Sequence, residues 1–285
     1  MILNKDTLIT ILSDMHSGGS TALFPNKTWW FDTERNHTPS ERQKGMFAHF
    51  VRCAGYARAN SRDKRHIIVH DGDSIEGAHH NTIQIVTPVL DEQAKIHMDL
   101  MGYFMKRARF DGRKGDKLYY VQGTETHTRE KEREIAEAMR AQRTEEGNRV
   151  FDFLELEVNG RSLWFLHHGK SRGRGPNEGN SLRNWLRDIY FDCQKQDTRP
   201  PDVVVSGHTH TPVYNAYVIS QGSGYHMIHG LVCPSWQAKT RYAWQVAPTE
   251  RNEIGAVFLE IRADGEIRMP VILKQETEQA RKVVV

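Results

Sequence analysis

The order of strand-like and helix-like segments predicts an α/β fold, a sandwich built from mixed β-sheets in one domain. In the first half of the chain, short β-branched apolar segments alternate with longer segments of helical spacing. In the second half, strand-like segments follow one another as hairpins. Alternation favours parallel strands and hairpins give antiparallel ones, so we expect both kinds of pairing. The sequence shows no internal repeat and no clear linker, which favours a single domain over residues 1–285.

The first strand is expected at residues 7–13 (TLITILS), a β-branched apolar run. Residues 17–39 are rich in Gly, Ser, Thr, Pro and Asn and predict a long loop, and such loops are usually functional or mobile. A helix should begin after Ser40, a good N-cap residue, and run to about Asn60. A second strand is expected at residues 66–70 (HIIVH).

The middle of the chain continues the alternation. Residues 91–110 carry apolar side chains near helical spacing and predict a second helix. Residues 117–122 (KLYYVQ) predict a third strand. Residues 129–147 pair Glu with Lys or Arg three and four positions apart, which is typical of a solvated helix.

Hairpins dominate the second half. Residues 151–158 alternate apolar and polar side chains, residues 159–160 (Asn-Gly) favour a type I′ turn, and residues 162–166 alternate again. A helix at 182–196 and a strand at 202–205 (DVVV) follow. The rest of the chain is expected to be β-rich, and we expect its tail, residues 275–285, to be disordered or docked on the body.

Composition excludes several classes of protein. No apolar stretch approaches the roughly 18 residues of a membrane helix, and the N-terminus has neither a basic region nor a cleavage site. A soluble cytoplasmic protein without a membrane partner is the default expectation. Three cysteines at wide spacing predict neither a disulfide framework nor a zinc ribbon. The net charge of +3 is too small to indicate nucleic-acid binding by itself, although it suits an anionic substrate.

Five apolar segments end in Asp, His or Gly beside further Asp or His residues. In open α/β sheets, functional groups gather beyond the carboxyl ends of the strands, so these segments could meet at one edge. Imidazoles mixed with carboxylates suit divalent transition metals. The five segments are Asp14-Met15-His16, Gly72-Asp73, Gly123-Thr124-Glu125-Thr126-His127, His167-His168-Gly169 and Gly207-His208-Thr209-His210.

In this order the segments resemble the motif series of the calcineurin-like metallophosphoesterases. That family shows Asp-x-His, Gly-Asp, Gly-Asn-His-Asp/Glu, His before Gly, and Gly-His-x-His. Any one motif is weak, but five in the right order at strand ends form a strong signal that extends from Ile11 to Thr211. The resemblance implies a sandwich of two mixed β-sheets flanked by helices. It also implies hydrolysis of phosphomonoesters or phosphodiesters, with nucleotides and nucleic acid among the substrates to consider.

The resemblance further implies two divalent metal ions that share a water. Ions about 3.5–4 Å apart would lower the pKa of that water, and the resulting hydroxide would attack phosphorus. Mn²⁺ is the expected ion, with Ni²⁺, Zn²⁺, Fe²⁺ and Mg²⁺ as alternatives. The implied ligands are Asp14, His16 and His210 for one ion, His168 and His208 for the other, and Asp73 as the bridge. Because neighbouring residues on a strand point to opposite faces, His167 is expected to pack away from the metals.

The third segment departs from the family pattern. Thr124 stands at the position of the family's Asn ligand, so Glu125 is expected to supply the missing oxygen, or the ion to carry an extra water. His127 comes two residues later than the family's catalytic His and is the expected proton donor or phosphate contact. His80 could line the mouth of the site. For Glu76, a position in a solvated loop is slightly favoured over a position in the site.

Two further interpretations stay open. Lys170 and Arg172, in a glycine-rich basic loop, could clamp a substrate phosphate or could be solvated charges. The altered third segment also allows a non-catalytic scaffold or interaction protein on the same fold. Retention of the other expected ligands argues against a scaffold, because clustered carboxylates and imidazoles are costly to bury without a metal.

Overall fold

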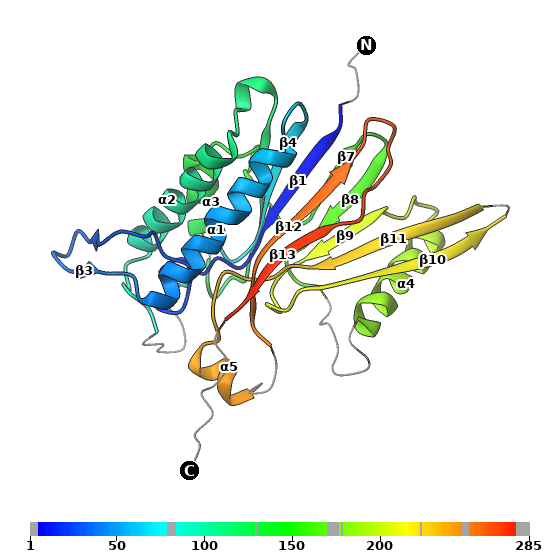
Figure 1. The fold of residues 1–285 in the computed structure, drawn as a ribbon. Helices are drawn as coiled ribbons and strands as arrows, with labels where there is room; N and C mark the ends of the chain where they lie inside the picture. The colour runs from blue at the N-terminus through cyan, green and yellow to red at the C-terminus, as the bar shows by residue number, and fades with distance from the viewer. Residues whose placement is uncertain are drawn as a thin grey trace.

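The computed structural model describes residues 5–78, 84–128, 130–169, 177, 179–222, 224–246 and 251–277. Two β-sheets pack face to face, and helices cover their outer faces (Figure 1). Both sheets contain parallel and antiparallel pairs, which confirms the predicted α/β sandwich with mixed sheets. Among the described residues, no helix combines the length and the hydropathy needed to cross a membrane.

The first sheet has six strands in the order β13-β12-β1-β4-β5-β6. The central strands run parallel to one another, and β12 and β13 add antiparallel pairs at one edge. Parallel neighbours have their carboxyl ends at the same edge of the sheet. The strands are β1 (Thr7–Leu12), β4 (Arg65–Asp71), β5 (Lys117–Val121), β6 (Val150–Phe151), β12 (Glu253–Ile261) and β13 (Val271–Glu276).

The second sheet has five strands in the order β10-β11-β9-β8-β7. Strands β8, β9 and β11 are parallel, whereas β7 and β10 are antiparallel to their neighbours. Asn159 and Gly160 have φ angles of 51° and 78°, as the predicted type I′ turn requires. The strands are β7 (Leu154–Val158), β8 (Arg161–Phe165), β9 (Val203–Ser206), β10 (Val213–Gln221) and β11 (Gly224–Val232).

Helices α1 (Glu41–Asn60), α2 (Leu90–Ala108) and α3 (Lys131–Ala138) cover the six-stranded sheet, and α4 (Asn180–Lys195) covers the five-stranded one (Figure 1). Ser40 caps α1 in a capping box with Gln43, as its side chain suggested. A short helix, α5 (Arg241–Val246), lies in the segment that was expected to be β-rich. The chain also forms the 3₁₀ turn η1 (Gly112–Lys114).

The core explains why β1 is apolar at every position. Ile9 and Ile11 face the second sheet, where they join a buried cluster with Leu163 and Val205. Leu8 and Leu12 face the opposite way and join the cluster beneath α1 and α2. Because alternate side chains of a strand enter different layers, a strand between two apolar layers reads as a continuous apolar run. A third cluster lies between α4 and the five-stranded sheet.

Two expected elements differ in the structure. The helix expected at 129–147 is α3 alone, and Arg140 soon after it adopts a left-handed φ of 54°. The turn lets Ala141 enter the core and Gln142 donate its backbone N–H to Leu118, contacts that a straight helix would not allow. The strand expected at 151–158 is divided, because β6 pairs with β5 in one sheet and β7 pairs with β8 in the other.

The loop at residues 17–39 packs against the body. Leu23 and Phe24 are fully buried, and the backbone N–H of Leu23 donates to Trp236. Two short strands, β2 (Trp29–Trp30) and β3 (Asn36–His37), pair within the loop. Its mobility stays a prediction. Strand β13 accounts for the start of the expected tail, and residues 278–285 lie outside the described residues.

Candidate metal centre

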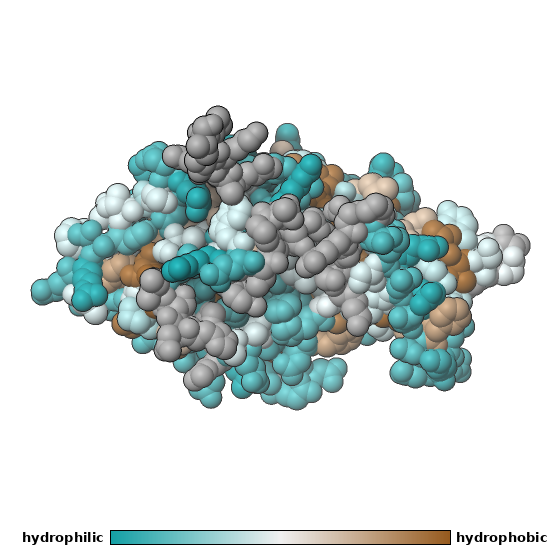
Figure 2. All heavy atoms as spheres, turned by 90° about the horizontal axis from the view of Figure 1, so that it is seen from below, coloured by the Kyte–Doolittle hydropathy of each residue, from teal (hydrophilic) through white to brown (hydrophobic). Residues whose placement is uncertain are grey.

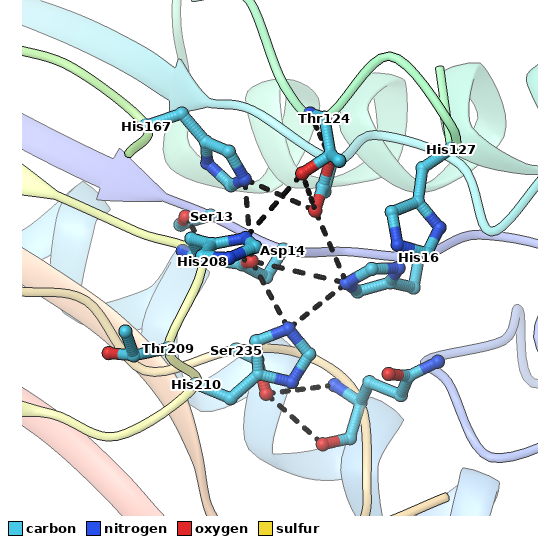
Figure 3. A network of polar contacts seen from close by, with 12 residues as sticks. Ser13, Asp14, His16, Thr124, His127, His167, His208, Thr209, His210 and Ser235 are labelled. Atoms are coloured by element: carbon cyan, nitrogen blue, oxygen red, sulfur yellow. Dashed lines mark hydrogen bonds and ion pairs between the residues drawn. The ribbon is translucent and has the colours of Figure 1, made fainter. Parts of the chain in front are cut away.

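The five segments singled out in the sequence come together at one edge of the sandwich. They follow the carboxyl ends of β1, β4 and β5 in the first sheet and of β8 and β9 in the second. Figure 3 shows side chains from both sheets converging on Asp14. In Figure 1, β1 runs downward, so its carboxyl end lies on the lower side of the molecule. Figure 2 shows that side, and its coloured residues are mostly hydrophilic. The site therefore lies where two sheets meet, which is why its residues are far apart in sequence.

The backbone at this edge is strained. Non-glycine residues rarely adopt positive φ, and such strain gathers at functional sites. Backbone hydrogen bonds hold the strained loops together, with Asp14 N–H donating to Gly72 at 3.0 Å and His16 N–H to Asp73 at 2.9 Å. The strained site residues are Asp14 (φ 52°), His16 (44°), Asp73 (53°), His208 (68°) and His210 (54°).

Two glycines allow the loops to approach closely. A Cβ on Gly123 would lie 2.2 Å from the backbone nitrogen of Asp73. A Cβ on Gly72, which has a φ of 77°, would lie 2.3 Å from Nδ1 of His167. Any larger residue would push Asp73 and His167 out of place, so these glycines are required by the geometry of the site.

Asp14 is the centre of the first donor group. Its Oδ1 lies 3.2 Å from Nε2 of His210 and 3.9 Å from Nε2 of His16. The two imidazole nitrogens lie 3.0 Å from each other. Asp14 also accepts the backbone N–H of His208 at 3.1 Å and a short hydrogen bond from the hydroxyl of Ser13. The group Asp14, His16 and His210 can therefore offer one carboxylate and two imidazole donors to a single ion.

Asp73 is the centre of the second donor group and also reaches the first. Its Oδ2 lies 3.1 Å from Nε2 of His167 and 3.7 Å from Nε2 of His16. Asp73, His167 and His208 can converge on one ion, and Asp73 also belongs to a group with His16 and His127. Its carboxylate thus lies between the two imidazole sets, as a bridging ligand would.

Burial makes the electrostatics of this cluster demanding. Burial raises the pKa of Asp14 and Asp73, but the neighbouring imidazoles outweigh it and hold both pKa values well below the ordinary range. Burial lowers the pKa of His16, yet Glu76 and the two aspartates raise it to about 9. In the same way, Asp14 and Asp73 raise the pKa of His167 to about 10. Two buried carboxylates require positive charge beside them, which imidazolium groups supply in part and divalent cations would supply further.

The structure contradicts the expectation that His167 packs away from the cluster, whereas the ligand role of His168 stays a prediction. His167 is buried, points into the cluster, and contacts the backbone oxygen of Asp71 through Nδ1 at 2.7 Å. His168 is exposed, and its ring lies against that of His208 with centroids 4.6 Å apart. The alternation rule failed because β8 ends at Phe165, so both histidines lie in a loop.

Thr124, and not Glu125, lies in the cluster. The backbone N–H of Thr124 donates to Oδ1 of Asp73 at 2.7 Å, and its hydroxyl lies 3.3 Å from Oδ2 of the same carboxylate and 3.5 Å from Nδ1 of His208. Glu125 is exposed and belongs to none of the metal-competent groups among the described residues. The expectation that Glu125 supplies the missing oxygen is therefore not supported by the geometry.

His127 and Glu76 lie beside the first donor group. His127 donates from Nδ1 to the backbone oxygen of Glu76 at 2.7 Å, and its ring lies edge-on to that of His16 with centroids 4.8 Å apart. Burial and the nearby His16 lower the pKa of His127. The carboxylate of Glu76 is buried, lies 3.1 Å from Nδ1 of His16 and accepts from Gln237 at 2.6 Å. The interpretation of Glu76 as part of a solvated loop was wrong, because the side chain is buried.

Three residues expected to bind substrate, His80, Lys170 and Arg172, lie outside the described residues. Of the seven expected metal ligands, five converge in the cluster, whereas His168 lies beside His208 and Glu125 lies at the surface. The donor set of buried carboxylates and imidazoles fits divalent transition metals.

The comparison with protein-family models identifies one family. The family model described as calcineurin-like phosphoesterase matches residues 7–242. A search of curated proteins finds no match.

Three solved structures are similar over most of the chain. A conserved uncharacterized protein from Streptococcus pneumoniae TIGR4, described as a predicted phosphoesterase, is 11% identical, covering 95% of this chain and 98% of its own at a TM-score of 0.32. Vps29 from Entamoeba histolytica, solved with Zn²⁺, is 10% identical, covering 93% and 99% at a TM-score of 0.35. A Thermotoga maritima protein solved by NMR is 14% identical, covering 94% and 98% at a TM-score of 0.36.

Proposed function

Because the chain belongs to the calcineurin-like phosphoesterase family, we propose that it is a metal-dependent enzyme that hydrolyses phosphomonoesters or phosphodiesters. The observation that carries the proposal is the convergence of Asp14 and Asp73 with five imidazoles from loops of the two sheets. Each metal-competent group keeps its donor atoms within 4.8 Å of one another. Acidic and imidazole side chains packed this closely are expensive to keep buried unless cations bind there.

The proposed ligands fall into two sets, one for each of two ions. Asp14, His16 and His210 would hold one ion, His167 and His208 the other, and Asp73 would bind both. Two such ions supply Lewis-acid activation of a water and neutralise charge on the phosphoryl oxygens. Mn²⁺ is the ion we would test first, because the site offers only nitrogen and oxygen donors.

Two side chains lie beside the donor groups without belonging to the proposed ligand set. The hydroxyl of Thr124 faces Asp73 and His208, where it can donate a hydrogen bond to an oxygen bound between them. His127 is fixed by its hydrogen bond to Glu76 and lies at the rim beside His16. We assign to His127 the contact with the leaving oxygen, to which it would transfer a proton.

The proposal is tested with chelator-treated protein and a defined set of substrates. Mn²⁺, Ni²⁺, Zn²⁺ or Mg²⁺ would be added to p-nitrophenyl phosphate, bis-(p-nitrophenyl) phosphate, single-stranded DNA and double-stranded DNA. Metal-dependent release of product from one class of ester supports the proposal and names the class. Stoichiometric metal binding with no ester cleaved would instead support the scaffold, which the substitution of Thr124 for the family's Asn favours.

Asp73→Asn is the matching variant. An amide oxygen can still accept the N–H of Thr124, so the loop should keep its shape, but the bridging charge is lost. We expect kcat to fall by about 100-fold to 1000-fold. Asp188→Asn, a similar change at an exposed position on α4, should leave kcat unchanged. A normal rate in Asp73→Asn would refute the assignment.

A further inference from the structure

Glu132, in the first turn of α3, is a buried acid outside the proposed ligand set. Its side chain has no exposed surface, although the charge pattern of its segment predicts a solvated helix. Burying a carboxylate is costly unless hydrogen bonds compensate it. The buried carboxylate of Glu132 must therefore accept hydrogen bonds from neighbouring groups.

The carboxylate joins the two loops that carry Asp73 and Thr124. Its Oε2 accepts the backbone N–H of Gly123 at 2.6 Å, and its Oε1 accepts the backbone N–H of Ser74 at 3.3 Å. The side-chain amide of Gln122 adds a third donor, 3.3 Å from Oε2. Ser74 directly follows Asp73 and Gly123 directly precedes Thr124, so one side chain binds the neighbours of both site residues.

These loops need external restraint. Gly72 and Asp73 both have positive φ, at 77° and 53°, a conformation that is unfavourable for an aspartate. The carbonyl of Ser74 is held as well, because it accepts from Nδ1 of His97 at 3.0 Å. Nε2 of His97 in turn contacts the hydroxyl of Tyr120 at 3.0 Å. The residue that follows Asp73 is thus fixed through both its N–H and its C=O.

We propose that Glu132 is a positioning residue that clamps the loops after β4 and β5 and so fixes the Asp73 carboxylate for metal binding. The contact that the clamp sets is the hydrogen bond of 2.7 Å from the N–H of Thr124 to Oδ1 of Asp73. This hydrogen bond leaves Oδ2 directed toward His16 and His167. The inference rests on the proposed function, because it concerns the binding of the same ions.

The chemistry of the clamp defines a nearly isosteric test. Both carboxylate oxygens accept N–H donors, so Glu132→Gln must turn an NH₂ group toward a backbone N–H or lose one contact. Glu134→Gln is the matched control, since Glu134 lies on the same helix and its exposed side chain contacts only Lys131 among the partners described here. Both variants replace a carboxylate oxygen by an NH₂ group, so they differ only in the position and burial of the side chain.

The primary measurement is Mn²⁺ affinity by isothermal titration calorimetry. Partners that orient metal ligands are typically worth tenfold to a hundredfold in affinity or activity, so we expect the Kd of Glu132→Gln to rise roughly tenfold or more. With bis-(p-nitrophenyl) phosphate at saturating Mn²⁺, we expect kcat to fall by a similar factor with KM within about twofold. Glu134→Gln should match the wild type in all three values. Wild-type Kd and kcat in Glu132→Gln would overturn the proposal.

Thermal unfolding without metal separates positioning from general stability. Glu132→Asp, which keeps the charge but reaches only one loop, provides a milder second variant. A folded Glu132→Asp with weakened Mn²⁺ binding supports the clamp, and one with wild-type binding contradicts it. If neither variant folds at the assay temperature, the carboxylate is a requirement for folding and the positioning role is rejected. A wild-type chain that binds no metal would refute the proposed function itself, whereas insensitive variants of a metal-binding chain refute only the clamp.

Discussion

The adjacent residues His167 and His168 provide a direct test of which imidazole holds metal. His167 lies 3.1 Å from Asp73, whereas His168 is exposed and contacts the ring of His208. We expect His167→Asn to raise the Kd for Mn²⁺ at least about tenfold, because it removes a donor from the cluster. His168→Asn, the same change one residue away, should alter the Kd less than about threefold. Calorimetric titration of both variants with Mn²⁺ measures the two Kd values. A larger increase in Kd for His168→Asn than for His167→Asn would assign the ligand role to His168.

Thr124 is the other residue where the chain departs from the family pattern. Its hydroxyl faces Asp73 and His208, but a hydroxyl is a weaker metal ligand than an amide oxygen. In Thr124→Asn the backbone N–H to Asp73 remains. We expect the second Mn²⁺ ion to bind roughly three to ten times more tightly, a gain of about 1 kcal/mol.

The measurement for Thr124→Asn is a two-site titration, with Thr126→Asn as the control, because Thr126 is exposed in the same segment. An unchanged second binding event would show that position 124 does not face an ion.

Residue identity could be predicted further than residue orientation. Asp14, Asp73 and His208 were identifiable because each follows an apolar strand and lies within two residues of a Gly or a His. The choice between His167 and His168 depended on where β8 ends, which side-chain periodicity does not reveal. Glu132 had no local signal, since the backbone groups that donate to its carboxylate lie 9 and 58 residues away.

Among the elements, β1 and β4 illustrate how much of the fold local pattern carries. Their continuous β-branched runs predicted buried strands, and the two strands pair in parallel at the centre of the first sheet. Helix α3 shows the limit, because its charge pattern predicted 129–147 but the helix ends at Ala138. Pairs of opposite charge report a solvated helical face, whereas the end of α3 is set by tertiary contacts around Ala141.

The pairing of β1 with β4 also predicts an acid sensitivity. His66 on β4 contacts the hydroxyl of Thr10 on β1 at 2.8 Å, and burial lowers the pKa of His66 to about 4, against a smaller opposing effect of Asp116. In the unfolded chain His66 takes up a proton near pH 6.5, but in the folded chain it does so only near pH 4. The free energy of unfolding should therefore fall as the pH drops from about 6.5 to 4, by up to about 3 kcal/mol from this residue.

Urea unfolding at several pH values checks this sensitivity. His66→Gln has no proton to gain and an amide that can still reach Thr10. Its loss of stability between pH 6.5 and 4 should be smaller than that of the wild type by about the same amount. Parallel curves for the two proteins would mean that His66 is not the group responsible.

At the scale of the whole molecule, the candidate metal centre also lies between two layers. Asp14, His16 and Asp73 follow strands of the six-stranded sheet, whereas His167, His208 and His210 follow strands of the five-stranded sheet. Ions bound by both sets would link the sheets at the edge where their loops meet, away from the apolar cluster between them. Binding there should stabilise the entire sandwich and not a single loop.

Thermal unfolding in EDTA and in Mn²⁺ tests this connection. An ion at about 100 times its Kd stabilises the folded state by about 2.7 kcal/mol. For a domain of this size, that free energy corresponds to a rise in Tm of about 4–5 °C. Asp73→Asn changes the residue that we propose binds both ions and should lose most of the shift, whereas Asp188→Asn, at an exposed position, should keep it. If Asp73→Asn showed the full shift, the stabilising ion would be bound elsewhere, for instance at the exposed His168, and the two sheets would be held together by their apolar contacts alone.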